Sequence, residues 1–244
     1  MTISKTAIDF PSENRINNNK EWYKAHKSVY RNEVVAPLAF LVENLSGVMF
    51  DIDPLLICSP KIGGSISRVR RDTRFSLDKT LYRDTAWICF SRRKEIYEGP
   101  PAFFICFSRR KEIYEGPPAF FFEFSPRGWD YGCGWYKADS ESLNYMRDCI
   151  LENNTLYTNA KRAYDSQNTF LLEGNKYKRS HFPAETEEKR DWLDRTGMSF
   201  VRYEKDNTIL FSDKLSDILK RDFLLLKDEY LFMISAYAEA HSPR

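Results

Sequence analysis

The spacing of apolar residues along the chain predicts both helices and strands. Apolar residues recur at helical intervals from Pro37 to Leu45, so Pro37 either kinks the preceding helix or opens a second one, and Gly47 ends the helix. Short apolar runs predict strands, and Ser125-Pro126-Arg127-Gly128 has the composition of a hairpin turn. The expected strands cover residues 66–69, 87–90, 120–124, 129–136, 200–203 and 209–211.

Polar and helix-breaking residues mark the other helices. Phe10-Pro11-Ser12 predicts a short helix with proline in its first turn, and Asn17-Asn18-Asn19 offers an N-cap to the next helix. Further helices are expected from Asp139, from Asn154 and over residues 185–193. A long C-terminal helix follows, with an apolar face formed by Leu215, Ile218, Leu219, Phe223 and Leu226. Helices flanking a central, mainly antiparallel sheet indicate an α+β fold.

Length and composition fit one globular domain over residues 1–244. The chain is 42% hydrophobic and 30% charged, as in soluble proteins that bury a core. No apolar run approaches the roughly 18 residues of a membrane span and the first residues lack a secretion signal, so we expect a cytoplasmic protein without membrane contact. The five cysteines lack Cys-x-x-Cys spacing and the three histidines are far apart, so no metal site is expected. The sequence specifies neither a cofactor nor an oligomeric state.

Residues 88–104 and 105–121 are identical tandem copies of one 17-residue segment. Solenoid repeats normally need at least three units of about 20 to 50 residues, so two perfect copies do not predict a repeat protein. We expect one copy to be surplus to the fold. In this interpretation one copy pairs in the sheet and the other is extruded as a hairpin or loop.

The segment from Arg68 to Tyr82 concentrates arginine, and residues 61–83 carry seven basic side chains against two aspartates. Guanidinium groups suit carboxylates and phosphates, so two interpretations are open. In the first, the arginines pair with Asp72 and Asp78 and fix a loop to the fold. In the second, the segment is an anion site, with Tyr82 as a hydroxyl donor. The basic residues of that site would be Arg68, Arg71, Arg74 and Lys79.

The same segment resembles the signature of the family called domain of unknown function 2461, which reads Arg-x-x-Arg-Asp-x-Arg-Phe-x-x-Asp-Lys-x-x-Tyr. The other matching pieces are Asn17–Tyr23, Val35–Leu38, Phe122–Pro126 and Tyr131–Gly134. Together these cover roughly residues 10 to 150. The resemblance implies a single cytosolic domain of bacterial or fungal type. It implies no activity, cofactor or catalytic residue.

Carboxylates complete the candidate chemistry. Asp72, Asp78 and Glu123 are the candidates for proton transfer, and burial among phenylalanines would raise the pKa of Glu123. Strand alternation offers the plainer interpretation that Glu123 points outward while its neighbours point into the core. The chain has no phosphate-binding Gly-x-x-x-x-Gly-Lys-Ser/Thr, His-Glu-x-x-His or Gly-x-Ser-x-Gly motif.

Two classes of function stay open. One is an enzyme acting on a phosphorylated or carboxylated small molecule that the arginine-rich segment holds. The other is a non-catalytic module that binds an anionic partner such as nucleic acid. Support for nucleic acid is weak, because the basic run Arg92-Arg93-Lys94 and its copy are also typical of a solvated surface.

Overall fold

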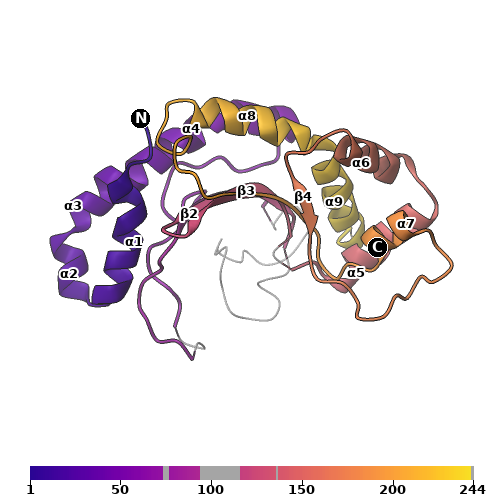
Figure 1. Ribbon diagram of the computed structural model, residues 1–244, viewed down its shortest axis with the longest axis horizontal. Coiled ribbons are helices and arrows are strands. Elements are labelled where there is room, and N and C mark those ends of the chain that lie inside the picture. The colour runs from indigo at the N-terminus through magenta and orange to yellow at the C-terminus, as the bar shows by residue number, and fades with distance from the viewer. Residues whose placement is uncertain (74–76, 94–115, 136, 243–244) are drawn as a thin grey trace.

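The computed structural model describes residues 1–73, 77–93, 116–135 and 137–242. These residues form a five-stranded antiparallel sheet that is curved, with helices along its convex side and at its ends (Figure 1). The sheet order is β1-β2-β3-β5-β4. Its strands are β1 (Ala86–Phe90), β2 (Ala119–Ser125), β3 (Gly128–Gly134), β4 (Leu171–Glu173) and β5 (Ser199–Glu204). The predicted α+β class is therefore confirmed.

The helices lie in three groups along the chain. The N-terminal group is α1 (Lys5–Asn17), α2 (Lys20–Ala25), α3 (Lys27–Val29), the π-helix η1 (Tyr30–Val35) and α4 (Ala36–Ile52). Between β3 and β5 lie α5 (Ser140–Leu151), α6 (Thr155–Asp165) and α7 (Glu187–Leu193). The C-terminal pair is α8 (Leu215–Leu225) and α9 (Lys227–Ala240).

Side-chain caps explain where several helices begin. The side chain of Asn19 accepts a hydrogen bond from the amide of Trp22 at the start of α2. Asp139 and Asn154 cap α5 and α6 in the same way, at 2.8 Å and 3.0 Å from the amides they bind. Each cap satisfies an amide that the helix itself leaves without a partner. The three starts predicted from these residues are confirmed.

Two helix boundaries differ from the predictions. Pro11 lies inside α1, because the helix begins earlier, with Ser4 as its N-cap. Gly47 does not end α4, which continues to Ile52. The buried side chains of Met49 and Ile52 extend its apolar face beyond the glycine. Their burial outweighs the roughly 1 kcal/mol that an interior glycine costs a helix.

The remaining differences concern the edges of the sheet and the C-terminus. Residues 66–69 form no strand, and Ile66 makes only isolated bridges to Ile62 and Ile88. Residues 209–211 form a turn, and the short edge strand β4 has no clear sequence signal. The predicted long C-terminal helix is interrupted at Leu226, so that α8 and α9 point in different directions (Figure 1).

The two faces of the sheet differ in composition. One face carries aromatic side chains against α8 and α9: the ring of Phe120 lies 5.4 Å from Phe223 and 5.0 Å from Tyr230. Strand register places a row of four residues on the opposite face. Trp87 pairs with Glu123, Glu123 with Asp130, and Asp130 with Tyr203. We call these four residues the acidic row.

Both tandem copies contribute to the first hairpin of the sheet. Ile88–Phe90 of the first copy lies in β1, and Ala119–Phe121 of the second copy lies in β2. In the register between them, Cys89 pairs with Phe121 and Phe90 with Phe120. The described pairing thus joins the start of the first copy to the end of the second, and the surplus of one copy stays a prediction. The intervening residues 94–115 lie outside the described part of the chain.

One continuous helical stretch, Lys27–Ile52, is long and apolar enough by length and composition alone to cross a membrane. Its Leu38, Val42 and Leu45 side chains are fully buried in the protein core. Core helices of soluble proteins pass the same criterion, and the structure has the form of a soluble globular protein. The cytoplasmic location stays a prediction.

Candidate functional site

The arginine-rich segment forms a hydrogen-bonded loop. Arg71 Nη1 donates to Asp78 Oδ2 and to the hydroxyl of Thr80, and the amide of Thr80 donates to Asp78 Oδ1 at 2.9 Å. The hydrogen bonds from Thr80 and Arg71 hold the pKa of Asp78 well below its usual range. An arginine–aspartate pair thus closes the loop, as the first interpretation of this segment expects. Asp78 stays ionised and is poorly suited to accept a proton near neutral pH.

Arg15 of α1 fastens this loop to the rest of the fold. Its guanidinium donates to Asp78 Oδ2 and to Asp84 Oδ1, both at 3.1 Å. Arg127, in the turn between β2 and β3, donates to the other oxygen of Asp84 at 3.1 Å. Burial alone would raise the pKa of Asp84, but these two arginines outweigh burial and hold the pKa below its usual value. Sequence reasoning missed Arg15 because it lies 63 and 69 residues from its two partners.

The other residues predicted to bind an anion are not equivalent. Arg68 is exposed, and we find no ion pair for it among the described residues. Lys79 is also exposed and donates to the backbone oxygen of Thr73 at 3.0 Å. Tyr82 is only 1% exposed, with its ring packed in the protein interior 5.4 Å from Tyr23.

Two of the predicted residues are less informative. Asp72 is half-buried in the same loop as Arg71. Arg74 lies outside the described residues. Arg68 is thus the predicted anion ligand that offers the most accessible guanidinium in the described part of the segment.

The acidic row holds two carboxyls that lack cationic partners. Glu123 and Asp130 are half-buried on adjacent strands, directly opposite each other, and neither forms an ion pair within the described residues. Burial, reinforced by the charges of Asp130 and Asp84, raises the pKa of Glu123 to about 7. Burial and the charge of Glu173 raise the pKa of Asp130 to about 6. Both interpretations of Glu123 therefore hold in part, since it leaves the aromatic core yet its pKa is raised by burial.

Basic groups stand beside this carboxyl pair without neutralising it. Arg83 and Arg127 each lower the pKa of Glu123, though less than burial raises it. The Arg83 guanidinium lies over the ring of Trp87, with its central carbon 4.7 Å from the ring centroid. At the other end of the row, the Tyr203 hydroxyl donates to Glu173 Oε2 at 2.7 Å. The row thus joins two protonatable carboxyls to neighbouring cationic and hydroxyl groups.

Gly132 lies on the same face, two residues after Asp130. A Cβ atom at Gly132 would lie 1.9 Å from the backbone oxygen of Phe200, so the close approach of β3 and β5 requires glycine. The strand register continues through Gly132 without a bulge.

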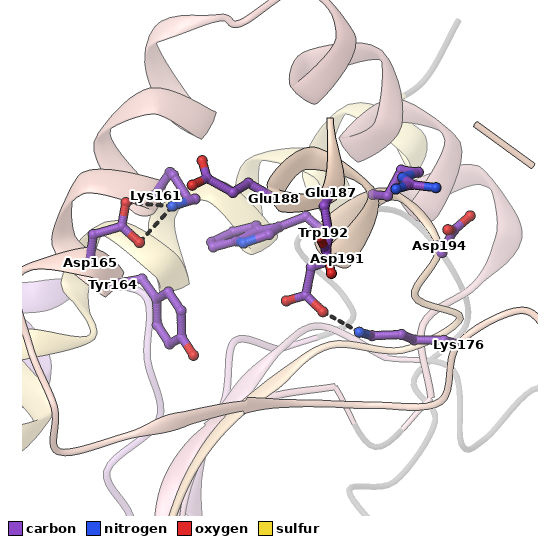
Figure 2. Close-up of a pocket in the computed structure, with 10 residues that line it drawn as sticks. Lys161, Tyr164, Asp165, Lys176, Glu187, Glu188, Asp191, Trp192 and Asp194 are labelled. Carbon is purple, nitrogen blue, oxygen red and sulfur yellow. Dashed lines mark hydrogen bonds and ion pairs between the residues drawn. The ribbon is translucent and has the colours of Figure 1, made fainter. Parts of the chain in front are cut away.

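The structure also has a cleft, which lies away from the acidic row, between α6 and α7 (Figure 2). It has a volume of about 640 Å³, within the usual range for small-molecule sites. Its lining is mostly charged, and Figure 2 shows two internal ion pairs, Lys161–Asp165 and Lys176–Asp191. Trp192 adds little accessible apolar surface, being 3% exposed. Because both lysines of the cleft are paired with aspartates of its own lining, we regard the acidic row as the stronger candidate despite its lack of a deep cleft.

The chemistry available at the acidic row is proton transfer. A carboxyl whose pKa lies near neutral can both donate and accept a proton at physiological pH. No group of three or more potential metal-ligating side chains occurs among the described residues. The row provides the proton-transfer group, and the adjacent arginines provide positive charge.

Comparison with known proteins identifies a family for this chain. The sequence model of the family described as "Conserved hypothetical protein (DUF2461)" matches residues 6–232. This match extends well beyond residues 10 to 150 and includes the acidic row and the first six residues of α9. No curated protein matches the chain.

Proposed function

The chain belongs to the DUF2461 family of conserved hypothetical proteins, and we propose that it is an enzyme acting on a phosphorylated or carboxylated small molecule. In this proposal Glu123 exchanges a proton with the substrate on the acidic row. Asp130 is the second carboxyl of the pair. The arginines beside the row hold the anionic group of the substrate.

The observation that carries this proposal is the environment of Glu123. It is a half-buried carboxyl opposite a second carboxyl, with no ion pair among the described residues. A purely structural acid would be expected to resemble Asp78 or Asp84, which arginines keep ionised. Placing two acids together without a cation costs stability, and such arrangements cluster at functional sites.

The cationic groups nearby support an anionic substrate. Arg127 is bound to Asp84 through one nitrogen, but its side chain is 72% exposed. A guanidinium has five N–H donors, so Arg127 retains donors for a phosphate or carboxylate. Arg68 is exposed in the adjacent loop and is the predicted ligand least committed to internal contacts. Asp72 and Asp78 are better assigned to the loop than to proton transfer.

A non-catalytic module for an anionic partner is the alternative. The exposed positions of Arg68 and Arg70 favour it, because two cations on one surface can bind a partner without any pocket. The two functions differ in their dependence on Glu123. An enzyme needs this carboxyl for turnover, whereas a binding module with nucleic acid as partner depends on the arginines and on salt.

A ligand screen with three proteins tests the proposal. Thermal shifts of the wild type, Glu123→Gln and Arg68→Ala are measured with phosphorylated metabolites, carboxylates and short oligonucleotides. Mixtures that shift the wild type are then incubated and analysed for product by mass spectrometry. We expect Glu123→Gln to keep the thermal shift and lose at least 100-fold in turnover, the lower range for losing an acid–base group.

Glu187→Gln, at an exposed glutamate of α7, is the matched control and should behave as the wild type. Equal turnover by Glu123→Gln and the wild type would contradict the enzymatic role. Binding of oligonucleotides alone, with affinity falling log-linearly with salt, would support the binding module instead. If no compound shifts the wild type, an anionic small-molecule substrate is excluded for the classes screened.

A further inference from the structure

Glu229, in the first turn of α9, is a buried acid. Its residue is 0% exposed, and neither carboxyl oxygen has a hydrogen-bond partner among the residues that the structure describes. The amide of Glu229 itself favours the charged form, but burial outweighs it and raises the pKa to about 8. An ionised carboxylate at this position would lose its hydration and would gain no hydrogen bond or ion pair from the described residues in return.

The charged and titratable neighbours of Glu229 do not neutralise it. On its own helix Asp228 adds negative charge and raises the pKa of Glu229 further. Across from α9, strand β3 presents Cys133, a buried thiol whose pKa is raised by burial and by the charge of Glu229. The neighbouring Tyr230 hydroxyl is engaged with Asp53, which also binds Arg92.

Of the other elements packed against α9, helix α8 carries Asp222, which binds Tyr131 and Arg221. Helices α5 and α6 contribute Cys149 and Tyr157, whose pKa values are raised chiefly by their own burial. None of these groups supplies a cation to Glu229 within the described residues. Its protonated form is therefore the form that fits between α9 and β3.

We propose that Glu229 is a pH-sensitive lock that holds the start of α9 against β3 when protonated and loosens this contact when ionised. Its position favours such a role, because Glu229 lies three residues after the break between α8 and α9 at Leu226. The adjacent Tyr230 joins α9 to Asp53 at the end of α4. Movement of this turn would therefore affect the junction of α4, α8 and α9.

The direction of the pH effect follows from the raised pKa. A glutamate in the unfolded chain titrates near 4.5, and Glu229 in the folded chain near 8. Well below pH 4.5 the Glu229 carboxyl is protonated in both the folded and the unfolded chain, so its favourable form contributes fully to stability. Between pH 4.5 and about 8 the folded state is progressively destabilised relative to the unfolded state, and above about 8 the loss is complete.

The test compares the wild type with Glu229→Gln, which is uncharged at every pH. The difference between their melting temperatures should change in favour of Glu229→Gln by about 3 °C per unit between pH 5 and 8. Asp228→Asn, in the same turn but partly exposed, is the matched control. The difference in melting temperature between Asp228→Asn and the wild type should change much less between pH 5 and 8.

Hydrogen exchange locates the effect. After correction for base catalysis, the protection of amides 227–233 in the wild type should fall between pH 6 and 9, and should stay constant in Glu229→Gln. If Glu229→Gln does not fold, Glu229→Leu provides the uncharged comparison. A melting-temperature difference that is independent of pH, or a loss of protection shared equally by wild type and variant, would overturn the lock.

Discussion

The tandem duplication allows an unusually clean test, because removal of either copy produces the same protein. Deleting Ile105–Phe121 leaves Ile88–Phe104 joined to Phe122, and deleting Ile88–Phe104 gives an identical sequence. The shortened chain retains the residues that form the hairpin, since Ala102-Phe103-Phe104 replaces Ala119-Phe120-Phe121 in β2. We therefore expect the deletion variant to keep the fold.

The expected gain in stability follows from the connection between β1 and β2. Ser91 to Pro118 comprise 28 residues, and the deletion reduces this connection to 11. Closure of a flexible connection costs about (3/2)RT ln n, so the change favours the folded state by about 0.8 kcal/mol. For a chain of this size, that corresponds to a rise in melting temperature of about 2 °C to 3 °C.

The contacts at the β1 end of the connection are retained in the deletion variant. Arg92 and its buried partner Asp53 are unchanged, as is the hydrogen bond from the amide of Ile57 to the backbone oxygen of Ser91. The assay is thermal unfolding followed by circular dichroism, with urea unfolding as a second measure. A control that replaces residues 94–110 with Gly and Ser keeps the length and should show no rise. A fall of more than 2 °C, or loss of soluble protein, would show that both copies contribute structure.

Four substitutions test the ionic and backbone features of the fold. Arg71→Ala should lower the unfolding free energy in urea by more than the roughly 0.5 kcal/mol of a surface change, and a smaller effect would contradict the loop network. Asp78 has a lowered pKa, so its contribution is present above the unfolded pKa and is lost on acidification; Asp78→Asn should flatten acid unfolding below about pH 4. Asp53→Asn should cost about 3 kcal/mol, because it removes the buried carboxylate charge that accepts hydrogen bonds from Arg92 and Tyr230, and calorimetry would detect this. Gly132→Ala should cost about 2 kcal/mol or more, and an unchanged melting temperature would show that β3 and β5 can separate.

Local sequence signals predicted the elements that depend on local chemistry. The caps at Asp139 and Asn154 and the hairpin between β2 and β3 are determined by residues within a few positions of each other. The end of α4 could not be predicted in this way. Gly47 is a local signal to stop, whereas burial of Met49 and Ile52 depends on packing that only the complete fold provides.

The same distinction applies to the candidate site. The sequence identified Glu123 and the arginine-rich segment, but it could not pair Glu123 with Asp130, because that pairing depends on strand register. It also could not show that Arg15 would bind Asp78 across the fold. Sequence proximity suggested that the loop arginines and aspartates act together, and the structure divides them between internal pairing and exposure.

The carboxyls of the described residues fall into two groups, those paired with arginine and those without a cationic partner, and the second group marks the candidate functional positions. Asp53, Asp78 and Asp84 have arginine partners that hold their pKa values below the usual range, and each fastens one part of the fold to another. Glu123 and Glu229 have no such partner among the described residues, and their pKa values are raised to about 7 and about 8. The part of the chain that the structure describes has abundant arginine, yet no arginine there pairs with these two acids. Because a desolvated acid without a cationic partner lowers stability, this arrangement supports our proposals of proton transfer at Glu123 and pH sensitivity at Glu229.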